Sequence, residues 1–262
     1  MWTPIEIGSA GRLFVRNLVR ERLSRLRTFA DRHARRRILV LGDSHVRAFE
    51  HWLFPLGMPR TRFDVTYVRG GTALGLQNAE SASGARRQFD AALARGPYDR
   101  VIVGLGEVDT AVSIWLVVEK HQLSVETVLN RALDRYLRFL EEVAADHDLV
   151  VLGACLPTID VYTADGDEVA VGRAAISATR RERTDLALAF NARVAAWCRA
   201  RAIPHLDSAT AALGPDGFVR SSWTALDARG RPDHHYARRR FARWILGELR
   251  RLPDRKASDR RT

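Results

Sequence analysis

The chain has few of the residues that would indicate a disulfide-linked, metal-binding or membrane protein. It contains only two cysteines in 262 residues, Cys155 and Cys198, and they are far apart. They provide neither a disulfide framework nor a set of metal ligands, so both are expected to be buried as small hydrophobic side chains. No apolar run approaches the roughly 20 residues that a membrane-spanning helix needs. The sequence therefore predicts a soluble protein.

The N-terminus lacks the features of an export signal. After Met1 the chain reaches a series of arginines without an apolar core or a small-residue cleavage site. A cytoplasmic location is the resulting prediction. Hydrophobic residues make up 46% of the sequence, an ordinary value for a globular protein, and the length suits one α/β domain with a full core.

Lysine is nearly absent, although the formal net charge is +11. Only Lys120 and Lys256 are lysines, and arginine supplies the rest of the positive charge. Such a bias fits a coding preference as readily as an acidic partner. The arginines are not interleaved with aromatic residues, and no DNA-binding motif accompanies them. We therefore expect no nucleic-acid partner.

The positive charge gathers at the two ends of the chain. Residues 1–36 are basic, and their apolar residues recur at about helical spacing, which predicts an amphipathic helix. Packing on the domain is the favoured role for this helix; contact with a protein partner or an anionic membrane surface is the alternative. Residues 253–262 are polar and basic, which predicts a disordered tail. The domain itself is expected over residues 37–252.

Strand and helix patterns alternate between these ends. Short apolar or β-branched runs predict five strands, at Arg37–Leu41, Phe63–Val68, Arg100–Leu105, Leu149–Leu152 and Ile203–Leu206. Apolar stripes predict helices at 124–145, with Ser124 as N-cap, at 181–201 and at 236–252. The alternation predicts an α/β fold, a three-layer α/β/α sandwich around a mostly parallel sheet of about five strands. Loops after the first three strands should then meet at the carboxyl edge of the sheet.

These loops carry residues suited to acyl transfer. Gly42-Asp43-Ser44-His45 follows the first strand, Gly70-Gly71 the second and Gly106-Glu107-Val108-Asp109 the third, while Asp233-His234-His235 precedes the last helix. A serine at a strand exit, backbone N–H donors and a late histidine beside an aspartate are the parts of a serine nucleophile with its base and oxyanion hole. Capping of the following helix by Asp43 or Ser44 is an equally good interpretation of the first motif alone.

In the order of these blocks the sequence resembles the SGNH, or GDSL-type, hydrolase superfamily, whose members are mostly esterases, lipases and carbohydrate deacetylases. The resemblance covers roughly residues 37 to 250. It implies a flavodoxin-like SGNH fold without a cofactor. It also implies that Ser44 is the nucleophile, His235 the base and Asp233 the residue that orients the base. The N–H groups of Ser44 and of Gly70 or Gly71 would form the oxyanion hole.

The third block departs from the family pattern, Gly-x-Asn-Asp, because Val108 replaces the asparagine. Loss of one oxyanion donor typically lowers the rate about 100- to 1,000-fold. Glu107 would need to be protonated to replace it, because an ionised carboxylate only accepts hydrogen bonds. The favoured interpretation is that Glu107 and Asp109 bind backbone N–H groups and shape the loop.

The last block also departs from the family, which usually has Asp-x-x-His. Either His234 or His235 could be the base here, and His235 is favoured because one residue separates it from Asp233. A metal site is not expected, since three ligands in one tripeptide without a clear fourth make a poor site. Asp43, His45, His234, Glu107, Asp109 and Trp115 are candidates to line the substrate pocket. For Trp115, packing in the core or at the rim is favoured.

The leading functional hypothesis is an esterase or carbohydrate deacetylase with a Ser-His-Asp triad, acting on a small-molecule or glycan ester. The first alternative is a non-hydrolytic glycan- or ligand-binding protein that keeps the fold. The second is an acyltransferase to a sugar or lipid hydroxyl. The distance from Ser44 Oγ to the nearest imidazole nitrogen tests whether the chain can perform either chemistry.

Overall fold

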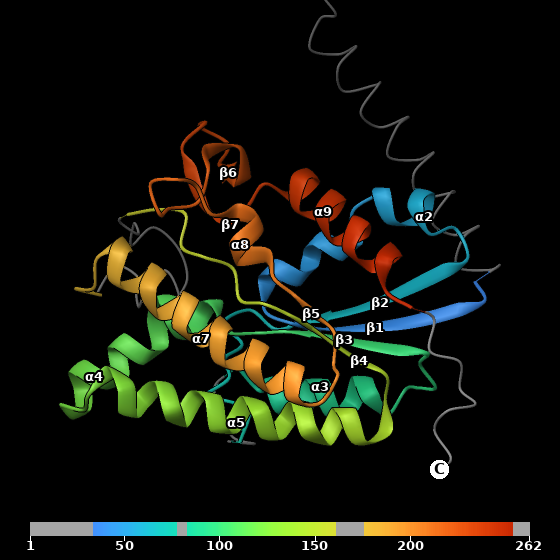
Figure 1. Ribbon diagram of the computed structural model, residues 1–262, viewed down its shortest axis with the longest axis horizontal. Coiled ribbons are helices and arrows are strands. Elements are labelled where there is room, and N and C mark those ends of the chain that lie inside the picture. The colour runs from blue at the N-terminus through green and yellow to red at the C-terminus, as the bar shows by residue number, and fades with distance from the viewer. Residues whose placement is uncertain (1–33, 78–82, 161–175, 254–262) are drawn as a thin grey trace, which may run out of the picture.

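A parallel five-stranded sheet forms the centre of the molecule (Figure 1). The computed structural model describes residues 34–77, 83–160 and 176–253. The predicted N-terminal amphipathic helix therefore lies outside the described residues, as does the predicted tail after residue 253.

The strands occur where the apolar runs predict them. They are β1 (Arg36–Gly42), β2 (Thr61–Tyr67), β3 (Arg100–Gly104), β4 (Leu149–Leu152) and β5 (His205–Leu206). The spatial order is β2-β1-β3-β4-β5 and every neighbouring pair is parallel, which confirms the flavodoxin-like sheet. The strand order reverses between β1 and β3, so the crevice at their carboxyl ends is where such folds bind ligands.

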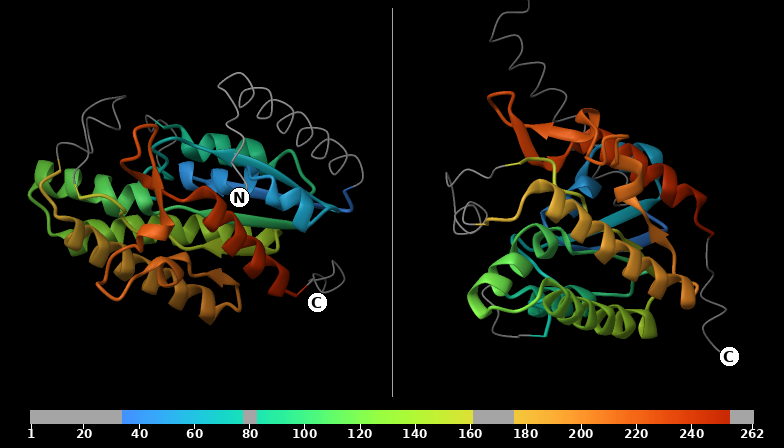
Figure 2. Two further views of the ribbon diagram at one scale, coloured as in Figure 1. Left: turned by 90° about the horizontal axis from the view of Figure 1, so that it is seen from above. Right: turned by 60° about the vertical axis from the view of Figure 1, so that its left-hand side comes forward.

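Helices cover both faces of the sheet, which explains the continuous apolar runs in the strands. In β1, Leu39 and Leu41 belong to one buried cluster, whereas Ile38 and Val40 belong to the other. The first cluster is covered by α3 (Ala85–Leu93), α4 (Ile114–His121), α5 (Val125–Asp146) and α7 (Arg180–Ala200). The second is covered by the 3-10 helix η1 (Ser44–Glu50), α2 (Leu53–Gly57), α8 (Ser208–Ala212) and α9 (Arg238–Arg251). Figures 1 and 2 show the resulting three layers.

Several local predictions are also confirmed. Ser124 caps α5 by accepting a hydrogen bond from the Thr127 N–H at 3.1 Å. Cys155 and Cys198 are buried free thiols. A π-helix, η2 (Asp109–Ser113), leads from the third loop into α4, and π-helical turns are frequent at functional sites.

An antiparallel hairpin that precedes the last helix was not predicted. Its strands are β6 (Thr224–Leu226), which follows the short 3-10 helix η3 (Ser221–Trp223), and β7 (Pro232–Tyr236). The last helix was expected from residue 236 but begins at Arg238, because the Tyr236 ring packs instead on Trp223, with ring centroids 5.6 Å apart. The motif Asp233-His234-His235 thus lies on a strand rather than in a loop.

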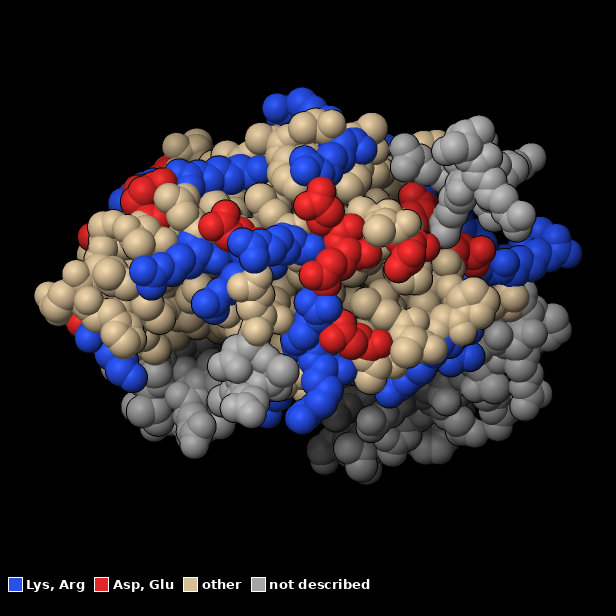
Figure 3. Space-filling view, turned by 90° about the horizontal axis from the view of Figure 1, so that it is seen from below, with Lys and Arg blue, Asp and Glu red and all other residues tan. Residues whose placement is uncertain are grey.

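Charged side chains of both signs share the face formed by α3, α5 and α7, which Figure 3 shows. Ion pairs join Arg193 to Glu126, Arg201 to Glu141, and Arg86 to Glu142 across these helices. The excess of arginine therefore does not form a surface of one sign there. Over the described residues, no helix combines the length and the apolar character that crossing a bilayer requires. The cytoplasmic location stays a prediction.

Replacement of Gly42 by alanine should destabilise the fold, because β1 and β3 approach closely at this residue. A Cβ at position 42 would lie 2.2 Å from the Gly104 carbonyl oxygen and 2.5 Å from a Val46 methyl group. We expect Gly42→Ala to lower the free energy of unfolding by about 2 kcal/mol or more, measured by urea denaturation.

Gly247 provides the matched control. It lies within α9, and a Cβ added there would meet no atom within 4 Å. Gly247→Ala should therefore raise the free energy of unfolding by about 0.5 to 1 kcal/mol. Equal effects of the two substitutions would contradict the close approach of β1 and β3.

Candidate active site

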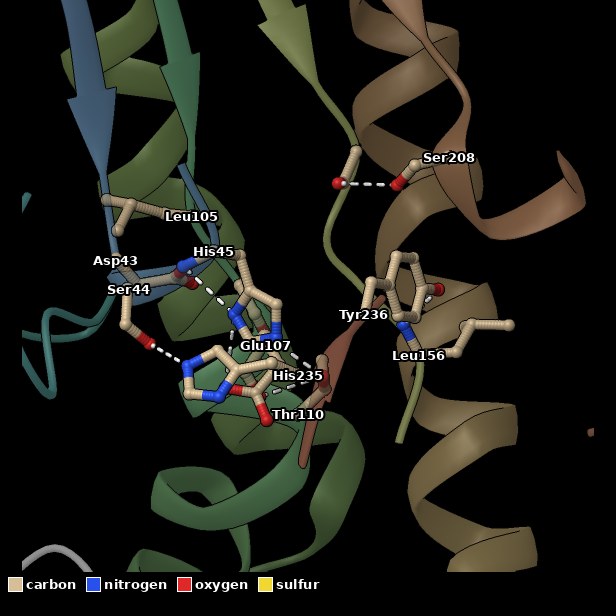
Figure 4. Close-up of polar contacts among 12 residues, drawn as sticks. Asp43, Ser44, His45, Leu105, Glu107, Thr110, Leu156, Ser208, His235 and Tyr236 are labelled. Atoms are coloured by element: carbon tan, nitrogen blue, oxygen red, sulfur yellow. Dashed lines mark hydrogen bonds and ion pairs between the residues drawn. The ribbon is translucent and has the colours of Figure 1, made fainter. Parts of the chain in front are cut away.

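Ser44 lies at the sharp exit of β1, where the strand turns into η1. The helix is capped by the preceding residue, since Asp43 Oδ1 accepts a hydrogen bond from the His45 N–H at 2.9 Å. The capping role therefore falls to Asp43, and the Ser44 hydroxyl points away from the strand toward β7 (Figure 4).

His235 is the histidine that meets Ser44. The distance from Ser44 Oγ to His235 Nε2 is 3.0 Å, although the two residues are 191 positions apart in the sequence. On the other side of the ring, His235 Nδ1 lies 3.4 Å from Asp233 Oδ1. With its proton on Nδ1, the imidazole can accept the serine hydroxyl proton at Nε2 while the carboxylate fixes the ring. The three side chains have the spacing that a nucleophile, a general base and an orienting carboxylate require.

Asp233 contacts both histidines of its motif. Its Oδ1 lies 2.7 Å from His234 Nδ1, closer than to His235, and the two imidazole rings are 3.8 Å apart between centroids. Hydrogen bonds from His234 and then His235 hold the pKa of Asp233 well below its usual range. Asp233 is therefore ionised, as an orienting carboxylate must be, and it is shared between two imidazoles.

The environment of His235 favours its neutral form. Burial lowers the pKa of His235, the nearby His45 and His234 act in the same direction, and the contact with Asp233 opposes them. A neutral imidazole is the form that can take a proton, so the environment suits a general base at neutral pH.

The sequence predicts an oxyanion hole from the N–H groups of Ser44 and of Gly70 or Gly71. Ser44 is the first residue of η1, so its N–H has no acceptor within the helix. Of the two glycines predicted as the second donor, Gly71 uses its N–H in a turn, donating to the Val68 carbonyl at 3.0 Å. Gly70 has a φ of 66°, a left-handed conformation that glycine adopts readily. Gly70 therefore fits the donor role better than Gly71.

Asp109 fastens the second loop to the third. Its two carboxylate oxygens accept hydrogen bonds from the N–H groups of Ala73 at 2.7 Å and Leu74 at 3.0 Å. The side chain is fully buried, and this burial raises its pKa to about 6. The interpretation that Asp109 shapes the loop is thus confirmed, as is the prediction that these loops meet.

The other third-block residues are buried as well. Val108 is almost inaccessible to solvent, and Glu107 lies with its Oε2 4.0 Å from His45 Nδ1. Trp115 packs against the core and donates its indole N–H to the Thr110 carbonyl at 2.7 Å, which confirms its packing role.

Two residues that hold the strand of His235 in place were not found from the sequence. The Thr158 hydroxyl donates to the Asp233 carbonyl at 2.6 Å, and the Tyr236 hydroxyl accepts from the Leu156 N–H at 2.8 Å. Both bonds tie β7 to the segment after β4. No motif signals them, because they depend on how two distant segments pack.

Two groups of side chains have the spacing to hold an ion. They are Asp233 with His234 and His235, and the buried set Asp43, His45 and Glu107; in each, the three ligand atoms lie within 4.8 Å of one another. An ion bound by the first group would compete with His235 Nδ1 for the Asp233 carboxylate. Each group supplies three ligand atoms, fewer than the four protein ligands typical of a structural zinc site.

The two neighbours of His235 should affect its titration in opposite directions. In an NMR titration of the His235 ring protons, we expect a midpoint below the ordinary value of about 6.5. Asp233→Asn should lower this midpoint further, because the substitution removes the negative charge that stabilises the imidazolium form. A midpoint that rises in Asp233→Asn would contradict the contact between the two side chains.

The structure is similar to solved esterases and lipases. No protein-family model and no curated protein matches the sequence. The inhibitor-bound aryl esterase of M. smegmatis has a TM-score of 0.54 at 13% identity, covering 83% of this chain and 100% of that one. A GDSL-like lipase from Bacteroides thetaiotaomicron has a TM-score of 0.51 at 12% identity, covering 87% and 96%. At such identities the likeness concerns the fold, and the chain has the α/β fold of the SGNH, or GDSL-type, hydrolases.

Proposed function

We propose that the protein is an esterase in which Ser44 is the nucleophile. The observation that carries this proposal is the 3.0 Å distance between Ser44 Oγ and His235 Nε2. Ser44 Oγ attacks the ester carbonyl while His235 takes the hydroxyl proton and then gives it to the leaving alcohol. Water releases the acyl group from Ser44 by the reverse proton path. Asp233 holds the imidazole through Nδ1 and stabilises the imidazolium that forms.

The negative charge on the carbonyl oxygen needs donors close to Ser44. In this proposal the N–H groups of Ser44 and Gly70 supply them. The substrate is a small-molecule or glycan ester. Structural neighbours whose names are aryl esterase and GDSL-like lipase support an ester as the reacting group.

Val108 favours a second candidate, a non-hydrolytic binding protein with the same fold. The side chain of Val108 has no hydrogen-bond donor for an oxyanion, so the pocket would bind an ester or glycan without cleaving it at a useful rate. An acyltransferase would use Ser44 in the same way and differ only in passing the acyl group to a sugar or lipid hydroxyl.

Ser44→Ala should abolish covalent labelling and hydrolysis. A fluorophosphonate probe is expected to modify the wild-type protein at Ser44, with the site identified by peptide mass spectrometry. The variant should hydrolyse p-nitrophenyl acetate at least about 1,000-fold more slowly, since the attacking atom is lost. Wild-type protein that is folded yet resists the probe and leaves the ester intact would refute the esterase proposal.

Val108→Asn should increase the rate if Val108 occupies the place of an oxyanion donor. We expect kcat for p-nitrophenyl acetate to rise about 10- to 100-fold with KM little changed, because the new amide bonds the oxyanion that forms only in the transition state. Val108→Leu has nearly the size of asparagine but no side-chain hydrogen-bond donor, and it should stay within about threefold of wild type. A rate that remains at the Ser44→Ala background in all three proteins would favour the binding protein instead.

A further inference from the structure

A third imidazole, that of His45, packs against the proposed base. The ring of His45 lies 4.9 Å from that of His235 between centroids, at an interplanar angle of 42° (Figure 4). His45 is the residue after Ser44 on η1, and its ring meets Tyr236 on the far side, edge to face at 6.3 Å. The proposed base is therefore held between the serine on one side and this histidine on another.

Two buried carboxylates lie beside His45. Asp43 Oδ1 is 3.1 Å from His45 Nδ1, and Glu107 Oε2 is 4.0 Å from the same nitrogen. Asp43 is 2% exposed, Glu107 1% and His45 6%. A carboxylate this far removed from water is stabilised by a nearby positive charge. A proton on the His45 ring would place such a charge 3.1 Å from Asp43 Oδ1.

We propose that His45 is a positioning residue that carries a proton shared with Asp43, and that it holds the His235 ring toward Ser44 while keeping that ring neutral. The proposal rests on the esterase function for its kinetic consequence. Its structural and electrostatic parts concern His235 itself and can be measured without turnover.

The titratable groups around the His45 and His235 rings determine whether His45 raises or lowers the pKa of His235. Asp43, Glu107 and Asp109 face the cluster from the first and third loops, while Asp233, His234 and Tyr236 face it from β7. Cys155 approaches from the segment after β4, and burial raises the pKa values of both Cys155 and Tyr236, so neither carries charge at neutral pH. His45 is one of the groups that lower the pKa of His235.

Loss of the His45 proton would raise the pKa of His235 in two ways. It would remove a positive charge next to the ring, and it would leave the charges of Asp43 and Glu107 without their partner. Both changes favour the imidazolium form of His235. A neutral residue at position 45 should therefore raise the pH below which His235 ceases to act as a base.

His45→Gln in the full chain tests this proposal, because glutamine keeps an N–H donor for Asp43 but cannot carry the charge. The NMR titration midpoint of His235 should rise by about one pH unit. The acid limb of the kcat/KM profile for p-nitrophenyl acetate should move by the same amount. At pH 7 we expect kcat to fall by up to about threefold, with a larger fall at lower pH, and KM to change less than twofold.

His205→Gln is the matched control. His205 is a partly buried histidine on β5, and among the described residues its ring makes no aromatic contact with His235. This variant should keep the wild-type midpoint and rate. A folded His45→Gln protein in which the midpoint is unchanged or lower would overturn the proposal, even if its rate or thermal stability fell.

A measurement on the wild-type protein tests the same point without a substitution. Nitrogen-15 shifts of the His45 ring should show both nitrogens protonated at pH 7, and one unprotonated nitrogen would overturn the proposal. If the wild type shows no Ser44-dependent hydrolysis, the esterase function fails. These ring measurements would still support or refute the effect of His45 on His235.

Discussion

The burial of acidic side chains at the carboxyl edge of the sheet is the constraint on which this site depends. Asp43, Glu107 and Asp109 are all buried there, and polar groups removed from water must find partners within the protein. Asp43 finds them in η1, where it fixes the turn that carries Ser44. Asp109 finds them in the loop after β2, which ties that loop to the loop after β3. The positions of Ser44 and of the neighbouring loops are thus determined largely by the hydrogen bonds that these buried carboxyl groups form.

The burial of these carboxyl groups also affects the protonation of His235. His235 lies between an ionised carboxylate, Asp233, and the imidazole of His45, which has carboxylates of its own. The His235–Asp233 and His45–Asp43 pairs therefore share one small region beside Ser44. Because charges in such a region interact strongly, the protonation of each group depends on that of the others. The observed titration steps are therefore properties of the whole cluster.

Much of this arrangement could be predicted from the sequence. The five strands were predicted because strands buried on both faces form uninterrupted apolar runs, and Ser44 because a glycine-containing turn follows one of them. The hairpin could not be predicted, because β6 has only three residues and Tyr236 resembles the first apolar residue of the last helix. The choice between Gly70 and Gly71 depends on a single turn hydrogen bond, which no spacing rule gives. The approach of His45 to His235 depends on packing between segments about 190 positions apart in the chain, beyond the reach of local patterns.

The hairpin that carries His235 has a mechanical consequence for the protein. Its two short strands stand apart from the central sheet, and the bonds from Leu156 and Thr158 help to anchor β7. A two-stranded unit of this size is only marginally stable by itself, so it is expected to open locally at a lower free energy than the sheet. Mild heating or low denaturant would then separate His235 from Ser44 while most of the molecule stays folded. The contact between these two side chains would be lost before the bulk of the secondary structure.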